Sequence, residues 1–304
     1  MLSELKRLVS AVRFASRMFA SSVEAVNSAC SIPVIPKNER GGIVVVEHPH
    51  SAASEALRLL GASLLRGQSA AALNGSRRRE GRREEKRSKV VLVTSAAPGE
   101  GKTTLVANLA VVLGETGKRV LVLSCDFRRP TIHELLEVPN LHGLSDVLKD
   151  PTSPQILNGC VLDTRFDGVS VAPSGATFDR PGEILGSDAM PRALREARAR
   201  ADVVLVDTAP ILAASDAAHM IPGADEVVVV ARAGIVTTSL AHRTREVLER
   251  LQSPPIGVVL NGAQETALPP GYREYFRRIP DLPEEGEGMG ETSPYHVPSE
   301  ADTV

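Results

Sequence analysis

Short apolar runs alternate with amphipathic stretches from about residue 89 onward. The runs are apolar at nearly every position, which is typical of strands buried on both faces. Their alternation with helical patterns predicts a doubly wound, mostly parallel α/β fold with helices on both sides of the sheet, whose ligands bind at the carboxyl ends of the strands. The predicted strands are 89–95, 119–125, 168–172, 202–207, 225–231 and 256–261, and the predicted helices are 103–116, 187–200 and 237–252.

The pattern before residue 89 is less regular. Residues 1–20 place apolar side chains at helical spacing and basic side chains on a different face, which predicts a short basic amphipathic helix. Such a helix either packs as an ordinary linker or lies on an anionic membrane surface, and we keep both interpretations open. A strand is predicted at 42–47 and a helix at 53–65.

These patterns divide the chain into three parts. Residues 1–40 form an N-terminal helix and linker, and residues 41–265 form the α/β domain, in which 66–88 is predicted to be a disordered insert because it is rich in basic residues. Residues 266–304 are rich in proline, glycine and acidic side chains, which predicts a flexible acidic tail.

Composition narrows the class of protein. The 304 residues are 42% apolar with a formal net charge of −2, so nucleic acid is not expected as the main partner. No apolar run is long enough to cross a bilayer, and three widely spaced cysteines favour a cytoplasmic setting. The chain has no tryptophan, and its three tyrosines, Tyr272, Tyr275 and Tyr295, all lie in the predicted tail.

The first strand of the regular region ends directly in the sequence AAPGEGKTT at 96–104, and a predicted helix follows. Strand, glycine-containing loop and helix in this order form a phosphate-binding P-loop, which makes the fold one of the P-loop NTPase type. Backbone N–H groups and the helix start bind the phosphates, the lysine adds a point charge, and the first threonine can bind Mg²⁺. The predicted nucleotide-binding residues are Ala97, Pro98, Gly99, Glu100, Gly101, Lys102, Thr103 and Thr104.

Two further strand ends carry aspartates. Asp126 follows the strand at 119–125, and Asp207 follows four apolar residues in the strand at 202–207. Carboxyl ends of parallel strands lie at the same sheet edge, so both carboxylates are expected beside the P-loop. Together with Thr103 they are the predicted Mg²⁺ ligands.

The chain resembles the bacterial tyrosine autokinases of capsule and exopolysaccharide synthesis, which are related to the MinD/ParA group of P-loop ATPases. The resemblance covers roughly residues 31–262. It rests on AAPGEGKTT, VLVLSCDFRRP, HGLSDVLKD, PGEILGSDAM, ADVVLVDTAPIL, VVVARAG and GVVLNG, in this order. The segment SIPVIPK at 31–37 also resembles the join between membrane adaptor and kinase in fused members.

The resemblance implies an ATP- and Mg²⁺-dependent transferase that phosphorylates the C-terminal tyrosines of a neighbouring copy. Lys102 would bind phosphate, Asp126 would serve the metal or the tyrosine hydroxyl, and Asp207 would be the Walker B carboxylate. Arg128 would add charge to the transferring group or pair with a nearby acid, and Asn261 would contact adenine. Glu55 and Arg58 match the start of a ring-forming E-x-x-R-x-x-R helix, which implies a homo-oligomer.

The resemblance also implies a membrane-spanning polysaccharide co-polymerase, or adaptor, as partner. The protein would then lie at the cytoplasmic face of the membrane through that partner, with residues 1–20 as a second contact.

Three departures from the family pattern set the alternatives. Ser124 stands where the first Walker A′ aspartate is expected, Gly61 replaces the second arginine of the ring-forming helix, and the tail has spaced tyrosines instead of a dense cluster. One alternative is an ATP-binding assembly or regulatory subunit with weak or no kinase activity. Another is a MinD/ParA-like positioning ATPase.

Overall fold

The computed structural model describes residues 28–33, 42–73, 88–149, 157–176, 180–253, 255 and 257–263. The strands are β1 (Ser28–Pro33), β2 (Lys89–Ser95), β3 (Val120–Cys125), β4 (Leu162–Asp163), β5 (Val169–Ala172), β6 (Val203–Thr208), β7 (Glu226–Arg232) and β8 (Gly257–Ala263). The helices are α2 (Val44–Glu47), α3 (Ala52–Leu73), α4 (Lys102–Glu115), α5 (Ile132–Leu135), α6 (Leu144–Lys149), α7 (Pro181–Leu185), α8 (Ala189–Arg200), α9 (Asp216–Met220), the 3₁₀ turn η2 (Ile221–Gly223) and α10 (Thr238–Arg250).

The described strands form one sheet in the order β1-β8-β7-β2-β6-β3-β5-β4. Every neighbouring pair is parallel except β4 and β5, which are antiparallel. The predicted mostly parallel α/β fold is therefore confirmed. β2 lies between β6 and β7. The P-loop therefore follows a central strand of the sheet and not an outer strand.

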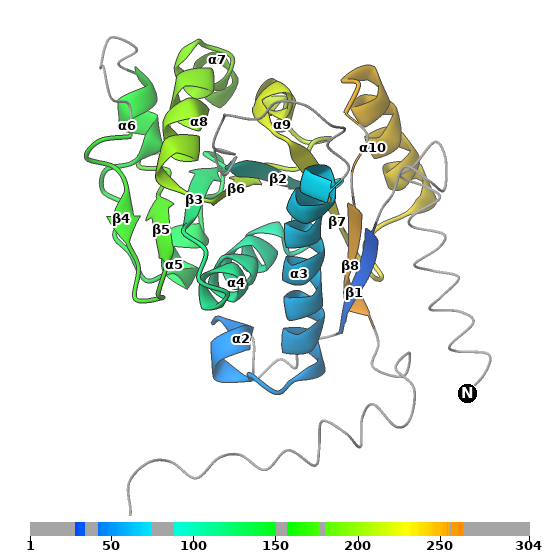
Figure 1. Cartoon of the computed structure of the whole chain (residues 1–304). Helices are drawn as coiled ribbons and strands as arrows, with labels where there is room; N and C mark the ends of the chain where they lie inside the picture. Colours follow the sequence, from blue (N-terminus) through cyan, green and yellow to red (C-terminus); the bar gives the residue numbers. More distant parts are fainter. Residues whose placement is uncertain are drawn as a thin grey trace, which may run out of the picture.

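Helices cover both faces of the sheet (Figure 1). The alternation of side chains along β2 shows the two layers directly: Val90 and Leu92 belong to one buried cluster, and Val91 and Val93 belong to the other. The first cluster includes side chains of α6, α7, α8, α9 and α10, and the second includes side chains of α2, α3, α4 and α5. Burial on both faces explains why the strands are apolar at nearly every position.

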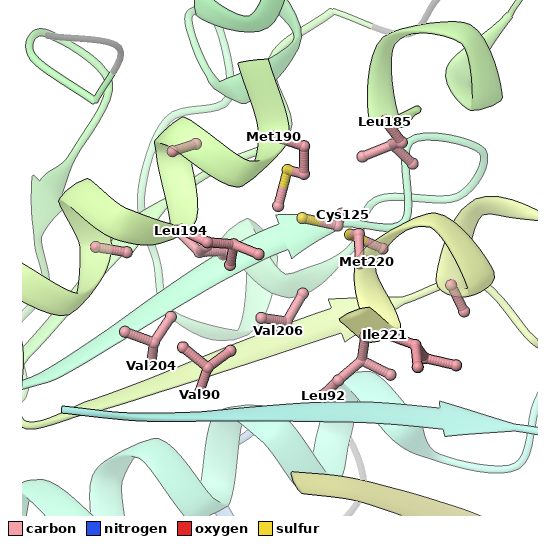
Figure 2. Packing of buried hydrophobic residues seen from close by; sticks show 14 of the residues in the cluster. Val90, Leu92, Cys125, Leu185, Met190, Leu194, Val204, Val206, Met220 and Ile221 are labelled. Carbon is pink, nitrogen blue, oxygen red and sulfur yellow. The ribbon is translucent and has the colours of Figure 1, made fainter. Parts of the chain in front are cut away.

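The first cluster reaches the carboxyl end of β3. Figure 2 shows Cys125 close to Met190 of α8 and Met220 of α9. All three side chains are buried, and burial together with neighbouring carboxylates raises the pKa of the Cys125 thiol. Cys125 is therefore a packing residue directly beneath the carboxyl edge of the sheet.

The structure corrects the predicted strand at 42–47. Its valines form the single helical turn α2, in which the amides of Val46 and Glu47 both donate to the carbonyl of Ile43. The amide of Val45 donates to the side chain of Asn108 on α4, at 3.2 Å. Packing against α4 overrides the strand preference of the valine run, because β-propensity depends strongly on tertiary context.

The predicted insert at 66–88 also begins too early. Helix α3 continues to Leu73, through the alanines at 70–72, which favour a helix. The elements β1, β4, α2, α5, α6, α7 and α9 were not predicted, because two to six residues are too few to show a reliable period. Within the described residues, no helix combines the length and the apolar composition needed to cross a bilayer.

Candidate nucleotide site

The P-loop connects β2 to the first turn of α4. Its backbone takes a left-handed conformation at Gly99 (φ 78°) and Gly101 (φ 94°), which glycine adopts without steric cost. The buried carboxylate of Glu100 accepts a hydrogen bond from the amide of Ala97 at 2.7 Å and closes the loop from inside. The predicted nucleotide-binding residues all lie in this loop or in the first turn of α4: Ala97, Pro98, Gly99, Glu100, Gly101, Lys102, Thr103 and Thr104.

Two residues from β7 and β8 form hydrogen bonds to backbone carbonyls of the loop. The Asn261 side-chain amide of β8 donates to the carbonyl of Glu100 at 3.0 Å. Arg232, the last residue of β7, donates from its guanidinium to the carbonyl of Gly99 at 3.0 Å. A Cβ atom on Gly101 would lie 2.1 Å from the Asn261 amide nitrogen, which could move aside, so the left-handed φ of 94° is what favours glycine here. The contact of Arg232 with the P-loop was not predicted, although Arg232 lies in the motif VVVARAG at 228–234. Adenine contact by Asn261 stays a prediction.

Asp207 lies beside Ser124 at the carboxyl edge, because the two residues are paired in the register of β6 and β3. Both are buried, and within the described part of the chain neither the Asp207 Oδ1 atom nor the Ser124 hydroxyl has a hydrogen-bond partner. Burial raises the pKa of Asp207 to about 7, the Thr103 hydroxyl and Lys102 lower it, and Asp126 raises it further. Buried polar atoms without partners at a strand end are expected where a ligand or ion binds.

Asp126 follows β3 and lies at the same edge. It is mostly buried, and its Oδ1 atom accepts hydrogen bonds from the amides of Arg128 at 3.3 Å and Arg129 at 3.1 Å. The guanidinium of Arg128 binds both carboxylate oxygens of Asp216, at 3.0 and 3.2 Å. Of the two roles considered for Arg128, the structure contains the pairing with an acid.

The donor set at this edge suits Mg²⁺, which prefers oxygen ligands and usually keeps substrate phosphates among them. Asp126, Asp207, Thr103 and Ser124 supply only oxygen atoms. No group of three or more His, Cys, Asp or Glu side chains among the described residues could hold a metal alone. Mg²⁺ held by these side chains would complete its coordination with water or with the oxygens of a bound nucleotide.

Helix α3 carries the residues expected to form rings. Arg58 pairs with Glu55 at 2.6 Å and also donates to the carbonyl of Pro49 at 2.6 Å, so its guanidinium is engaged within its own chain. Gly61 is buried, and a Cβ atom there would lie 2.8 Å from Val112 of α4. Gly61 is the position at which the family pattern has a second arginine. In this structure its small size allows α3 to pack closely on α4.

Several predicted features lie outside the described residues. They are the basic helix at 1–20, positions 74–87 of the predicted insert, and the acidic tail at 266–304 with its acceptor tyrosines Tyr272, Tyr275 and Tyr295.

Comparison with known proteins identifies the family of the chain. Residues 88–253 match the family model described as AAA_31, an AAA domain. The chain is 37% identical to the tyrosine-protein kinase YwqD of Bacillus subtilis over 178 residues, which cover 59% of this chain and 74% of YwqD. The chain therefore belongs to the family of bacterial tyrosine-protein kinases built on a P-loop AAA domain.

Further similarities show the extent of the shared region. The chain is 31% identical to the tyrosine-protein kinase wzc of Salmonella typhimurium over 262 residues, which cover 86% of this chain but only 34% of wzc. The kinase domain of the Escherichia coli tyrosine kinase ETK superposes with a TM-score of 0.68 at 28% identity, covering 82% of this chain and 97% of that domain.

The similarity to MinD lies in the fold. The septum site-determining protein MinD of Pyrococcus horikoshii superposes with a TM-score of 0.50 at 24% identity, covering 64% of this chain and 79% of MinD. The shared fold is that of a P-loop ATPase, and a fold of this type implies nucleotide binding.

Proposed function

We propose that the protein is an ATP- and Mg²⁺-dependent tyrosine autokinase that regulates the polymerisation and export of a capsular or exopolysaccharide. One observation carries the proposal: in a chain of this family, Lys102, Thr103, Asp126 and Asp207 all lie at the end of the sheet where the P-loop begins. Phosphoryl transfer depends on positioning and charge, which such a set of groups supplies.

The proposed reaction moves the γ-phosphoryl group from ATP to a tyrosine. A bond forms between the phenol oxygen and the γ-phosphorus, the bond to the β,γ-bridging oxygen breaks, and ADP leaves with that oxygen. Bound Mg²⁺ would neutralise developing negative charge on the phosphates. Asp126 takes the phenol proton and passes it to solvent, Lys102 binds the β- and γ-phosphates, and Asp207 holds the metal side of the site.

Tyr272, Tyr275 and Tyr295 are the proposed acceptors, donated by a neighbouring copy. They are the three tyrosines of the chain, and all follow the last described strand. Transfer in trans requires self-association, and we propose that the surface around Glu55 and Arg58 takes part in it. When two copies associate, Arg58 either keeps its bonds to Glu55 and Pro49 of its own chain or replaces them with bonds to the other copy.

The proposed partner is a membrane-spanning polysaccharide co-polymerase or adaptor, and the kinase would bind it at the cytoplasmic face. Full-length relatives favour this arrangement, because the chain spans about a third of the length of wzc.

A second candidate is an ATP-binding assembly subunit with weak or no kinase activity. It is favoured by Ser124, whose buried hydroxyl brings no negative charge to offset Mg²⁺. Export of polymer would then depend on nucleotide binding and not on phosphotyrosine.

Incubation with labelled ATP and Mg²⁺, followed by peptide mass spectrometry, separates the candidates. The autokinase is expected to label tail tyrosines, and a variant with Tyr272, Tyr275 and Tyr295 all changed to Phe should take up none. Label that persists in this variant contradicts tail acceptors. If the native protein binds MgATP but takes up no label, the assembly function replaces the kinase.

A further inference from the structure

The ion pair between Arg128 and Asp216 links two segments that follow different strands. Arg128 comes shortly after β3, and Asp216 is the first residue of α9, after β6. The Nε and Nη2 atoms of Arg128 donate to Oδ2 and Oδ1 of Asp216, which is the two-pronged geometry that arginine forms with a carboxylate. The Asp216 side chain is fully buried, whereas that of Arg128 is 48% exposed.

The Arg128 end of this pair is connected to Asp126. The main-chain amide of Arg128 donates to Asp126 Oδ1 while its side chain holds Asp216. A rotation of the Arg128 backbone would therefore disturb both contacts together. Through this single residue, the orientation of the Asp126 carboxylate depends on the position of Asp216.

The Asp216 end is connected to the start of the P-loop. The segment between Asp207 and Asp216 is tied to the end of β2 by two bonds: the amide of Ile211 donates to the carbonyl of Ser95 at 2.9 Å, and the hydroxyl of Thr94 donates to the carbonyl of Ala209 at 3.2 Å. Asp216 thus has a position that is set relative to the P-loop and to the Walker B strand.

We propose that Asp216 is a positioning residue, which acts through Arg128 to hold Asp126 at the correct distance from the P-loop phosphates and the metal. The inference rests on the proposed nucleotide chemistry of this site. Neither residue need touch the substrate, because a displacement of about 1 Å at a reacting group can slow catalysis by about a hundredfold.

A second arginine–aspartate pair provides a matched control. Arg119 and Asp202 lie just before β3 and β6, the same two strands, but at the opposite end of the sheet, with a guanidinium-to-carboxylate distance of 3.3 Å. Asp202→Asn removes the same charge from the same strand pair without reaching the nucleotide edge. A role in strand pairing alone would make Asp202→Asn and Asp216→Asn equivalent.

The test compares full-length Asp216→Asn, Asp202→Asn and native protein by autophosphorylation rate at saturating ATP, KM for ATP, and the Mg²⁺ concentration needed for half-maximal binding of ADP. Asp216→Asn is expected to lose about 10- to 100-fold in rate with KM changed less than about threefold. Its Mg²⁺ midpoint should rise several-fold. Asp202→Asn should match the native protein in all three measurements.

Arg128→Lys is a second test variant, to be used if Asp216→Asn fails to fold. It keeps the positive charge beside Asp216 but loses the two-pronged geometry, so the same losses are expected at a smaller size. A native rate and Mg²⁺ midpoint in Asp216→Asn, or equal losses in Asp202→Asn, would overturn the inference. If the native protein transfers no phosphate, the autokinase proposal fails, and the Mg²⁺ midpoint of ADP binding still decides the role of Asp216.

Discussion

The two ends of the parallel sheet differ in how their charged side chains are paired. At the amino end, three cations each lie within 4.0 Å of a carboxylate, in the pairs Lys89 with Glu226, Arg119 with Asp202, and Arg198 with Asp225. Two buried oxygens there, the Ser88 hydroxyl and one oxygen of Glu226, have no hydrogen-bond partner within the described structure, but the other Glu226 oxygen contacts Lys89. These pairs join neighbouring strands and helices. Their charges interact with each other and not with a ligand.

At the carboxyl end, buried oxygens of Asp207 and Ser124 have no hydrogen-bond partner within the described structure. The pair of Arg128 and Asp216 resembles the amino-end pairs. The two ends differ in how their unpartnered oxygens are placed: the Glu226 carboxylate contacts Lys89, whereas Asp207 and Ser124 carry unpartnered oxygens on paired positions of neighbouring strand ends. Buried polar groups held in this way are typical of functional sites.

The largest difference is expected between two lysine-to-methionine variants, one at each end of the sheet. One should lose activity and the other should lose stability. Lys102→Met removes the charge that we propose binds the β- and γ-phosphates, and it should lower phosphoryl transfer by at least about a hundredfold. Lys89→Met, a matched change at the amino end, should leave the rate per folded molecule unchanged. Labelled-ATP assays on both variants test this, and a Lys102→Met protein with near-native transfer would contradict the assigned site.

The cost of Lys89→Met should instead appear in folding. Lys89 is buried, pairs with Glu226, and donates to the carbonyl of Leu64 on α3 at 2.7 Å. Leaving Glu226 buried without its cation should lower the free energy of unfolding by about 3 kcal/mol. Denaturant unfolding measures this, and adding Glu226→Gln to the same chain should recover most of the loss.

Asp207→Asn should reveal the cost of burying the Asp207 carboxylate, whose Oδ1 atom has no hydrogen-bond partner among the described residues. Its folded-state pKa is raised from 3.8 to about 7, so between these pH values only the unfolded chain has released the proton, and stability falls as pH rises through this window. The shift is worth about 4 kcal/mol. Without metal or nucleotide, Asp207→Asn should therefore be more stable than the native protein at pH 8 by up to about that amount.

Unfolding curves in EDTA at several pH values give the comparison for Asp207→Asn. The advantage should shrink toward zero as pH falls below the ordinary value of 3.8, because both the folded and the unfolded native protein then hold the proton. A variant that is less stable than the native protein at pH 8 would show that Asp207 has a stabilising partner.

The smallest effect is expected for Arg119→Gln. The Arg119 side chain is 65% exposed, and Asp202 keeps a hydrogen bond from the main-chain amide of residue 119 at 3.1 Å. The free energy of unfolding should change by less than about 1 kcal/mol and the transfer rate should not change. A larger loss, measured by the same unfolding assay, would mean that exposed pairs at the amino end also hold the strands together.

Local signals predicted most of the fold and the outline of the site. The runs that became β2, β3, β6, β7 and β8 are long and apolar enough to be recognised, and the P-loop is continuous in sequence. The valine run at 43–46 carried a strand signal and became a helical turn, because Asn108 and the apolar face of α4 bind it. The contact of Arg232 with Gly99 had no local signal, since it spans 133 positions.

By itself the sequence determined the α/β alternation, the P-loop and the two strand-end aspartates, because each is encoded by neighbouring residues. Only the tertiary structure decided that Gly61 serves the packing of α3 on α4 and that Arg128 is bound to Asp216. It also decided which buried oxygens keep no partner. These outcomes depend on distances between segments far apart in the chain, which the chain acquires only when the sheet assembles and brings its strand ends together.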